Sequence, residues 1–275
     1  MKRNSAISIL LVVCTVGSMQ PGSADPAVPT QIVTSLTGPE SAVWDATTEA
    51  WYISFGGFSG RGGVARLAEG SSEPVVFTGD MSGPQGVTIF EGTMYVADGD
   101  VIHVIDMADP EDRSTISIRA ANDLDVDDDT GDVYVTDLGG NTIWRILAGS
   151  DAAEAFATIN APDGIYVKDG GVYIANFALG GPGGLYRFDI ATGQRSTIVE
   201  LPGATLDGLE SDGEDWLVTD FSKGHLLRIT EDGTVTPAGQ FLVGSADLGL
   251  NPETRVIAVP NLLLNNVIFA DLDAI

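Results

Sequence analysis

The 275-residue chain contains a single cysteine, Cys14, and two histidines, His103 and His225. Cys14 lies in an N-terminal segment that we expect to be cleaved off, so the mature chain has neither a disulfide nor a thiolate nucleophile. The sequence also lacks a Gly-x-Ser-x-Gly elbow, and neither histidine lies where a triad base is expected. Cysteine and serine hydrolase chemistry are therefore both disfavoured.

Basic residues are scarce as well. The chain has 13 Lys and Arg against 39 Asp and Glu, which gives a formal net charge of −26 at pH 7. Nucleic acids and anionic membranes are disfavoured as partners, because both carry the same sign of charge. Such a field concentrates cations, although an acidic surface that serves solubility alone is the simpler interpretation.

Long apolar runs are also missing. The longest run, residues 6–16, follows a basic pair and precedes the small residues 22–24, as in a secretory signal peptide. It is too short for a good membrane span, which needs about 20 apolar residues. We therefore predict a signal peptide over residues 1–24, no membrane span, and export to the periplasm or the extracellular space. Residues 25–275 form one predicted domain.

A sequence motif recurs six times in that domain. Each copy begins with a short polar step and continues into an apolar strand pattern; the copies occupy residues 39–44, 84–89, 121–126, 162–167, 206–211 and 245–250. A turn and a second strand rich in Val, Ile, Tyr and Trp follow each copy, at residues 51–55, 94–98, 133–137, 172–176, 216–220 and 256–260. A repeat of about 40 residues with four strands is typical of a β-propeller blade.

The last repeat lacks its fourth strand, and residues 31–36 at the start of the domain have the same extended, apolar character. The sequence thus predicts an all-β fold, a six-bladed β-propeller with four-stranded blades, in which this N-terminal strand closes the ring. Closure leaves only short, protected sheet edges.

The first strand of a propeller blade lines the central channel, so equivalent motif residues should converge near the axis. The second motif position is occupied by Glu40, Gln85, Asn122, Asp163, Asp207 and Ala246. Three of these six are carboxylates, which would repel one another unless a cation lay between them. Oxygen ligands of this kind suit a hard divalent cation, and Ca²⁺ fits best, because neither histidine falls in this column. The alternative is that these residues only solvate the channel or bind turn amides.

The motifs resemble those of the SMP-30/gluconolactonase/LRE-like propellers, in particular a divergent exported bacterial branch. The resemblance rests on residues 39–45, 122–123, 162–165, 206–209 and 245–249 and extends over the whole predicted domain. It implies a divalent metal held by Glu40, Asp163 and Asp207, with Asn122 beside it as a further ligand or a substrate contact. In lactone-hydrolysing members the residue that matches Asp207 also acts as the base, which takes a proton while the cation polarises the carbonyl.

Two positions depart from the pattern of the lactonases. These usually carry Asn where this chain has Asp163, and they place a substrate-gripping Arg where this chain has Ala120. Arg119, one residue away, and Gln85, from the same column as Asn122, are the remaining candidate substrate-binding residues. We therefore expect a monomeric metal-dependent hydrolase of a lactone or related small ester. The alternative is a non-catalytic propeller in which a structural cation ties the ring together and which binds a ligand or a protein.

Overall fold

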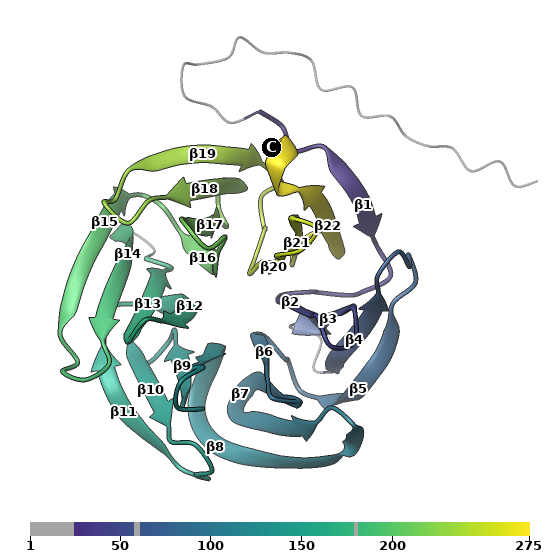
Figure 1. Ribbon diagram of the computed structural model, residues 1–275, viewed down its shortest axis with the longest axis horizontal. Coiled ribbons are helices and arrows are strands. Elements are labelled where there is room, and N and C mark those ends of the chain that lie inside the picture. The colour runs from purple at the N-terminus through teal and green to yellow at the C-terminus, as the bar shows by residue number, and fades with distance from the viewer. Residues whose placement is uncertain (1–24, 58–60, 179–180) are drawn as a thin grey trace, which may run out of the picture.

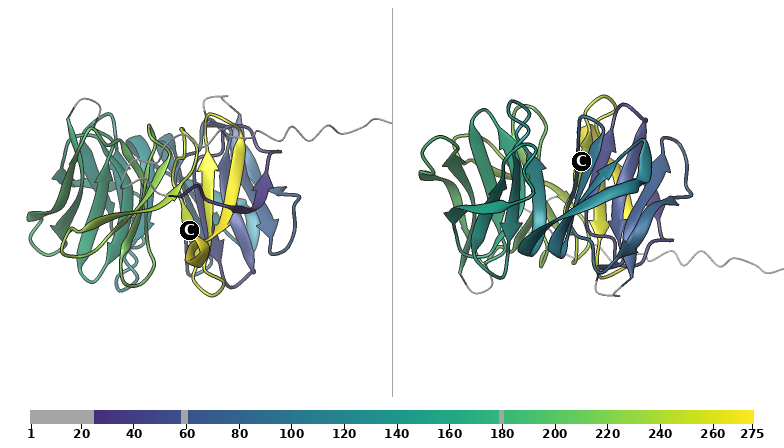
Figure 2. Two further views of the ribbon diagram at one scale, coloured as in Figure 1. Left: turned by 90° about the horizontal axis from the view of Figure 1, so that it is seen from above. Right: turned by 90° about the horizontal axis from the view of Figure 1, so that it is seen from below.

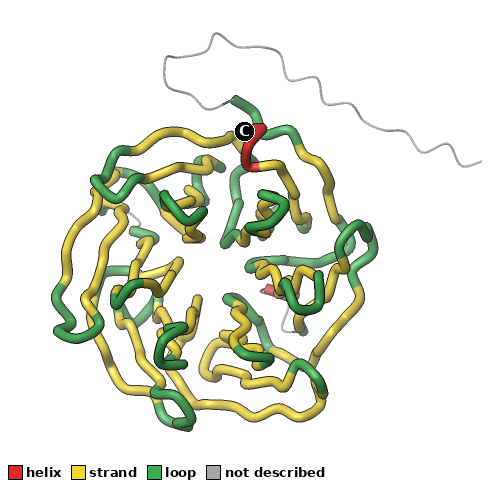
Figure 3. The backbone as a smooth tube through the Cα atoms, in the orientation of Figure 1, coloured by secondary structure: helices red, strands yellow, loops and turns green. Residues whose placement is uncertain are grey.

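The computed structural model describes residues 25–57, 61–178 and 181–275. The predicted signal peptide, residues 1–24, lies outside the described residues. The described chain is built almost entirely of strands and loops, with a short 3₁₀ helix at Leu272–Ala274 (Figure 3). None of the helices in these ranges is long and apolar enough to cross a membrane.

The strands form a ring of sheets around a central axis, and in the side views they run between the two faces of the ring (Figures 1 and 2). Three sheets contain four consecutive strands each. They comprise β2 (Ala42–Asp45), β3 (Ala50–Phe55), β4 (Gly62–Ala68) and β5 (Val75–Met81); β12 (Pro162–Lys168), β13 (Gly171–Asn176), β14 (Pro182–Asp189) and β15 (Arg195–Pro202); and β16 (Leu206–Ser211), β17 (Trp216–Asp220), β18 (His225–Ile229) and β19 (Val235–Gln240). The β-propeller prediction is confirmed by this arrangement.

The ring closes as the sequence predicted. The N-terminal strand β1 (Pro29–Val33) pairs antiparallel with β22 (Asn266–Asp271) and completes a sheet with β21 (Val256–Asn261) and β20 (Gly249–Asn251). The pairing sets Ile32 opposite Ile268, so that the two ends of the domain share one sheet. The strand occupies 29–33 rather than the predicted 31–36.

The prediction of six blades is wrong, because the described residues form five sheets rather than six. The fifth has six strands: β6 (Val87–Phe90), β7 (Thr93–Asp106), β8 (Asp109–Val126), β9 (Val133–Asp137), β10 (Thr142–Ile146) and β11 (Ala153–Thr158). β7 pairs first with β6 and then, from Gly99, with β8, and β8 pairs with β9 from Ala121. Gly99 and Ala120 have positive φ angles of 62° and 48°, which let the chain bend where sequence patterns predicted strand breaks.

Despite this fusion, the six motif segments follow one another around the axis, in β2, β6, the end of β8, β12, β16 and the β20 segment (Figure 1). Consecutive segments touch all the way round, through the pairs Ser41 with Val87, Gly86 with Asn122, Asp123 with Ile165, Gly164 with Asp207, Gly208 with Asp247, and Asp247 with Ser41. The motif residues therefore form a closed inner ring.

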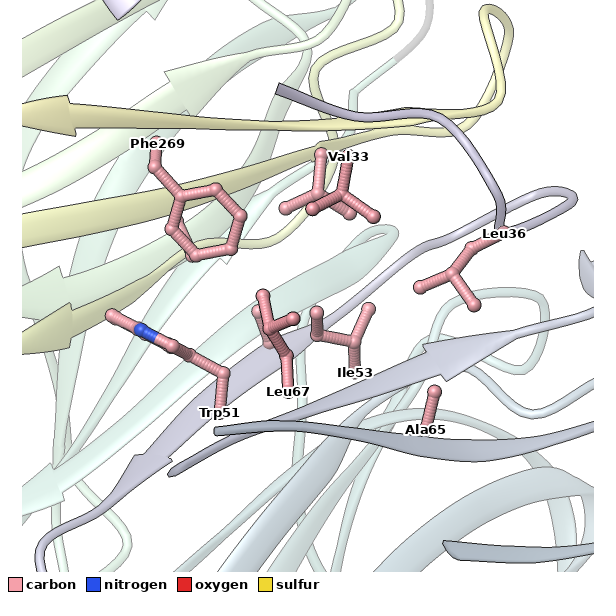
Figure 4. Packing of buried hydrophobic residues seen from close by; sticks show 10 residues of the cluster. Val33, Leu36, Trp51, Ile53, Ala65, Leu67 and Phe269 are labelled. Carbon is pink, nitrogen blue, oxygen red and sulfur yellow. The ribbon is translucent and has the colours of Figure 1, made fainter. Parts of the chain in front are cut away.

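The hydrophobic core lies between neighbouring sheets. Figure 4 shows Val33 of β1 and Phe269 of β22 facing Trp51 and Ile53 of β3 and Leu67 of β4. The ring centroids of Trp51 and Phe269 are 5.6 Å apart in an edge-on arrangement. These contacts pack the closing sheet against the first consecutive sheet, so burial of apolar surface holds the ring shut and fixes the inner ring of motif segments.

Candidate metal centre and axial channel

The second motif position brings four polar side chains into the interior. Glu40, Asn122, Asp163 and Asp207 have exposed fractions of only 4 to 7%. Gln85 is half-buried, and its Oε1 accepts a long hydrogen bond of 3.5 Å from Asn122 Nδ2. These residues stand at one end of the inner ring, because each lies just before or at the start of an inner strand or, for Asn122, just after the bend at Ala120 from which β8 pairs with β9.

A local irregularity positions three of these side chains. The ladder between the inner and the second strand shifts register at Asn122, Asp163 and Asp207, in three different sheets. A bulge at this point bends the strand and redirects its side chains, and such bulges occur often beside functional sites. In these three motif copies, regular pairing of the inner strand is interrupted at the polar residues that open the motif.

The third motif position, which sequence reasoning passed over, contributes two more carboxylates. Asp123 accepts hydrogen bonds from its neighbour Leu124 N, at 2.8 Å, and from Ile165 N of the next inner strand, at 3.0 Å. Asp247 accepts a hydrogen bond of 2.6 Å from Ser41 Oγ across the ring. Both carboxylates therefore join neighbouring inner strands.

Glycine at the same motif position in the neighbouring inner segment makes room for each of these two aspartates. A Cβ at Gly86 would lie 2.3 Å from Asp123 Oδ1, and one at Gly208 would lie 2.6 Å from the Asp247 Cα. Because real side chains do not approach so closely, the acid and the glycine are complementary. In the third column each aspartate follows a copy that carries glycine, and this order was the signal that could have revealed the contact.

The buried carboxylates raise one another's pKa. Burial is the largest cause for Glu40, whose pKa lies well above its usual value, and the charges of Asp207, Asp247 and Asp123 add to it. The pKa of Asp163 is raised by burial and then by Asp207 and Glu40. The group is thus short of positive charge, and a bound cation would relieve both burial and repulsion.

The donor set suits an oxygen-binding cation. Glu40 Oε2 and Asn122 Oδ1 are buried acceptors without a hydrogen-bond partner, and such atoms are costly unless an ion, water or ligand satisfies them. As the side chains stand, no three His, Cys, Asp or Glu residues in the described ranges are close enough together to hold an ion. The residues fit a hard cation in the kind of their ligand atoms and in their burial.

Arg119 does not share this interior position. It is exposed on β8, before the bend at Ala120. Of the predicted site residues, the structure places Glu40, Asn122, Asp163 and Asp207 in the interior, Gln85 at its margin, and Arg119 on the surface.

A cavity of about 330 Å³ opens at the opposite end of the inner ring. Asp125 and Glu210 line it together with Trp44 and Tyr166. Burial raises the pKa of Asp125 to about 7 and that of Glu210 to about 8. Neither carboxylate belongs to the second motif column. Asp123 and Asp247 line the same cavity, which therefore reaches the carboxylates of the third motif position.

Replacement of Glu210 by Gln should flatten the dependence of stability on pH. Because the pKa of Glu210 is raised in the folded chain, the folded state holds this proton more tightly than the unfolded state does. Its stabilising effect is complete below about pH 4.5 and is lost as the pH rises through about 8. One pKa unit corresponds to about 1.4 kcal/mol, and solvent in the open cavity reduces the effect. We therefore expect Glu210→Gln to be more stable than the wild type by roughly 2 kcal/mol at pH 9 and nearly equal at pH 4.5.

Urea unfolding at both pH values measures this difference. The exposed Glu154 provides a matched control, because Glu154→Gln should preserve the wild-type pH dependence. If Glu210→Gln and wild type lost stability in parallel between pH 4.5 and 9, the burial of Glu210 would not have the stated effect.

Comparison with known proteins supports the fold and goes no further. No protein family model matches the chain, and no curated protein matches its sequence. Among solved structures, it is similar to regucalcin from Agrobacterium tumefaciens, a calcium-binding protein, with a TM-score of 0.69 and 13% identity over 90% of this chain and 94% of the other. It also resembles a chain of the nidogen/laminin complex, with a TM-score of 0.62 and 16% identity over 72% of this chain and 79% of the other. By architecture the chain is therefore a β-propeller similar to regucalcin.

Proposed function

We propose that this chain is an exported, calcium-dependent hydrolase of a lactone or related small ester, and a divergent member of the SMP-30/gluconolactonase/LRE-like propellers. The observation that carries the proposal is the group of buried carboxylates at one end of the inner ring, with the unpartnered acceptors Glu40 Oε2 and Asn122 Oδ1. The likeness to a calcium-binding propeller is consistent with it.

Glu40, Asp163 and Asp207 would hold the ion, and Asn122 Oδ1 would complete the set. A bound Ca²⁺ supplies Lewis acidity, which polarises the ester carbonyl. The amide Nδ2 of Asn122 and the side chain of Gln85 would orient the substrate; these two side chains share a hydrogen bond of 3.5 Å.

Asp207 would act as the general base. It accepts a proton from the attacking water as the water oxygen bonds to the carbonyl carbon, and it returns a proton to the alcohol oxygen when the carbon–oxygen ester bond breaks. Burial and the charge of Asp247 raise the pKa of Asp207 in the ion-free chain.

A structural role for the ion is the second candidate. This chain carries the carboxylate Asp163 where the lactonases usually carry Asn. The added negative charge would bind the ion more tightly and lower its Lewis acidity toward a substrate. Asp123 and Asp247 also join neighbouring inner strands beside the same group. An ion at this point would connect several sheets and stabilise the ring without chemistry.

Hydrolysis of a panel of lactones and aryl esters by the purified mature chain, with and without a chelator, separates the two candidates. The proposal expects turnover that the chelator abolishes and that added calcium restores. Calcium bound at one ion per chain without turnover of any substrate would favour the structural role.

A further inference from the structure

Four large aliphatic side chains are exposed on one face of the ring. Leu242 and Val243, in the connection between β19 and β20, have exposed fractions of 48% and 52%. Leu263 and Leu264, in the turn between β21 and β22, have 54% and 51%. Contiguous apolar patches on a soluble surface generally mark binding sites.

The two segments are held together by specific contacts. Asn261 Nδ2 donates hydrogen bonds to the carbonyl oxygens of Leu242 and Val243, at 3.3 and 3.0 Å, and Asn261 Oδ1 accepts one from Leu264 N, at 2.9 Å. Gly244, at φ +90°, approaches Leu263 so closely that a Cβ would lie 2.6 Å from Leu263 Cγ. These aliphatic side chains are therefore presented on two segments fixed to each other.

Backbone contacts place two phenylalanines between this patch and the chain that leads to the buried carboxylates. Gly244 N donates a hydrogen bond of 2.8 Å to Phe221 O, and the rings of Phe221 and Phe177 are 5.6 Å apart. Phe177 N bonds to Ala161 O and Phe221 N to Thr205 O. Phe177 and Phe221 thus lie beside the chain two residues before Asp163 and Asp207. We call the six residues Phe177, Phe221, Leu242, Val243, Leu263 and Leu264 the apolar band.

One of the six residues at the second motif position is apolar, and it lies on the side of the ring where the band lies. This residue is Ala246, which is 1% exposed and follows the Leu242–Ser245 segment directly. A ligand whose carbonyl lies at the carboxylates would therefore meet apolar side chains in the direction of β20. The band side chains carry no hydrogen-bonding groups, so they would not satisfy a polyhydroxylated ligand.

We propose that the apolar band binds the alkyl chain of the substrate, so that the substrate is an alkyl-substituted lactone or ester rather than a sugar lactone. This inference rests on the proposed function. The occupant follows from the placement of Phe177 and Phe221, because Phe221 is hydrogen-bonded to Gly244 of the band segment and both phenylalanines lie beside the chain that leads to the candidate site. Contact of the chain with the band supplies affinity in proportion to the apolar area that it removes from water.

The test uses γ-lactams, which resist hydrolysis, with alkyl substituents of increasing length. Titration calorimetry of the calcium-loaded mature chain should show binding about threefold tighter for each added methylene until the band is covered. The double variant Leu263→Ser, Leu264→Ser should lose most of this gain, while its affinity for the shortest lactam stays unchanged. Both leucines are about half exposed, so the variant should melt close to the wild type.

Leu147→Ser is the matched control. Leu147 is 44% exposed and follows the end of β10. β10 runs antiparallel to β9, from Thr142 beside Asp137 to Ile146 beside Val133. Its end therefore lies on the face opposite to the candidate site. This variant should keep the wild-type dependence on chain length.

Three outcomes would overturn the inference: absence of lactam binding at every length, affinity independent of chain length, or an equal loss in Leu147→Ser. Sedimentation in the same buffers measures the oligomeric state and so tests whether a second copy of the chain covers the band instead. A dimer that the double variant dissociates, with unchanged lactam binding, would also overturn the inference. An affinity for lactams that rises with chain length, without turnover of any lactone, would support alkyl binding by the band and contradict the proposed hydrolase activity.

Discussion

Substitution of Asp207 by Asn should lower kcat by about two to four orders of magnitude at saturating calcium, with a smaller change in KM. An amide cannot accept the proton of the attacking water, and loss of a positioned general base typically costs this much. The folded chain should tolerate the change, because a neutral side chain removes one of the repelling buried charges around Glu40 and Asp163. Steady-state kinetics on the most active lactone measures the effect.

Because Asp207 is also a proposed ligand, its calcium content must be measured in parallel. Calcium occupancy close to that of the wild type together with lost turnover would identify Asp207 as the base. The exposed Asp112 supplies the control, since Asp112→Asn should have wild-type kinetics. Retention of full activity by Asp207→Asn at saturating calcium would refute its assignment.

Calcium should raise the melting temperature of the mature chain by roughly 10 °C at pH 8. An ion present at a thousand times its dissociation constant stabilises the folded state by about 4 kcal/mol, and each kcal/mol shifts the melting temperature of a domain of this size by about 2–4 °C. The raised pKa values of Glu40, Asp163 and Asp207 mean that the ion-free fold loses stability as the pH rises above the ordinary carboxyl range. Calcium should therefore stabilise the protein more at pH 8 than at pH 5.

The variant Asp163→Asn, Asp207→Asn isolates the cause of this shift. With two charges removed, it should melt at a higher temperature than wild type without calcium at pH 8 and should respond little to added calcium. Scanning calorimetry at pH 5 and pH 8 measures the melting temperatures of the wild type and the double variant, each with and without calcium. A wild-type melting temperature that is indifferent to calcium, chelator and pH would contradict the account of the buried carboxylates.

Much of the fold followed from periodicity. β9 and β17 occupy the predicted residues 133–137 and 216–220, and the N-terminal strand closes the ring. Glu40, Asp163 and Asp207 of the second motif column all lie in the interior, and their role as metal ligands stays a prediction. The repeated strands and this shared burial have one cause: equivalent positions in a radial repeat are brought to equivalent distances from the axis.

The failures concern contacts between repeats. Gly99 and Ala120 bend the chain without breaking the hydrogen-bonded ladder, and no strand propensity distinguishes a bend from an end. Asp123 and Asp247 were passed over because their contacts are with a glycine or serine of another motif copy, far away in the sequence. Arg119, assigned by its nearness to Asn122 in sequence, is exposed because a bend separates the two.

The central claim is that the buried ends of the motif segments bind one cation. Calorimetric titration of the chelator-treated mature chain with Ca²⁺, beside Glu40→Gln, tests it most directly. We predict one calcium per chain in the wild type and an affinity at least tenfold weaker in Glu40→Gln, because that variant lacks the carboxylate whose Oε2 has no partner in the fold. A wild type that binds no calcium, or a variant that binds it equally well, would contradict the account.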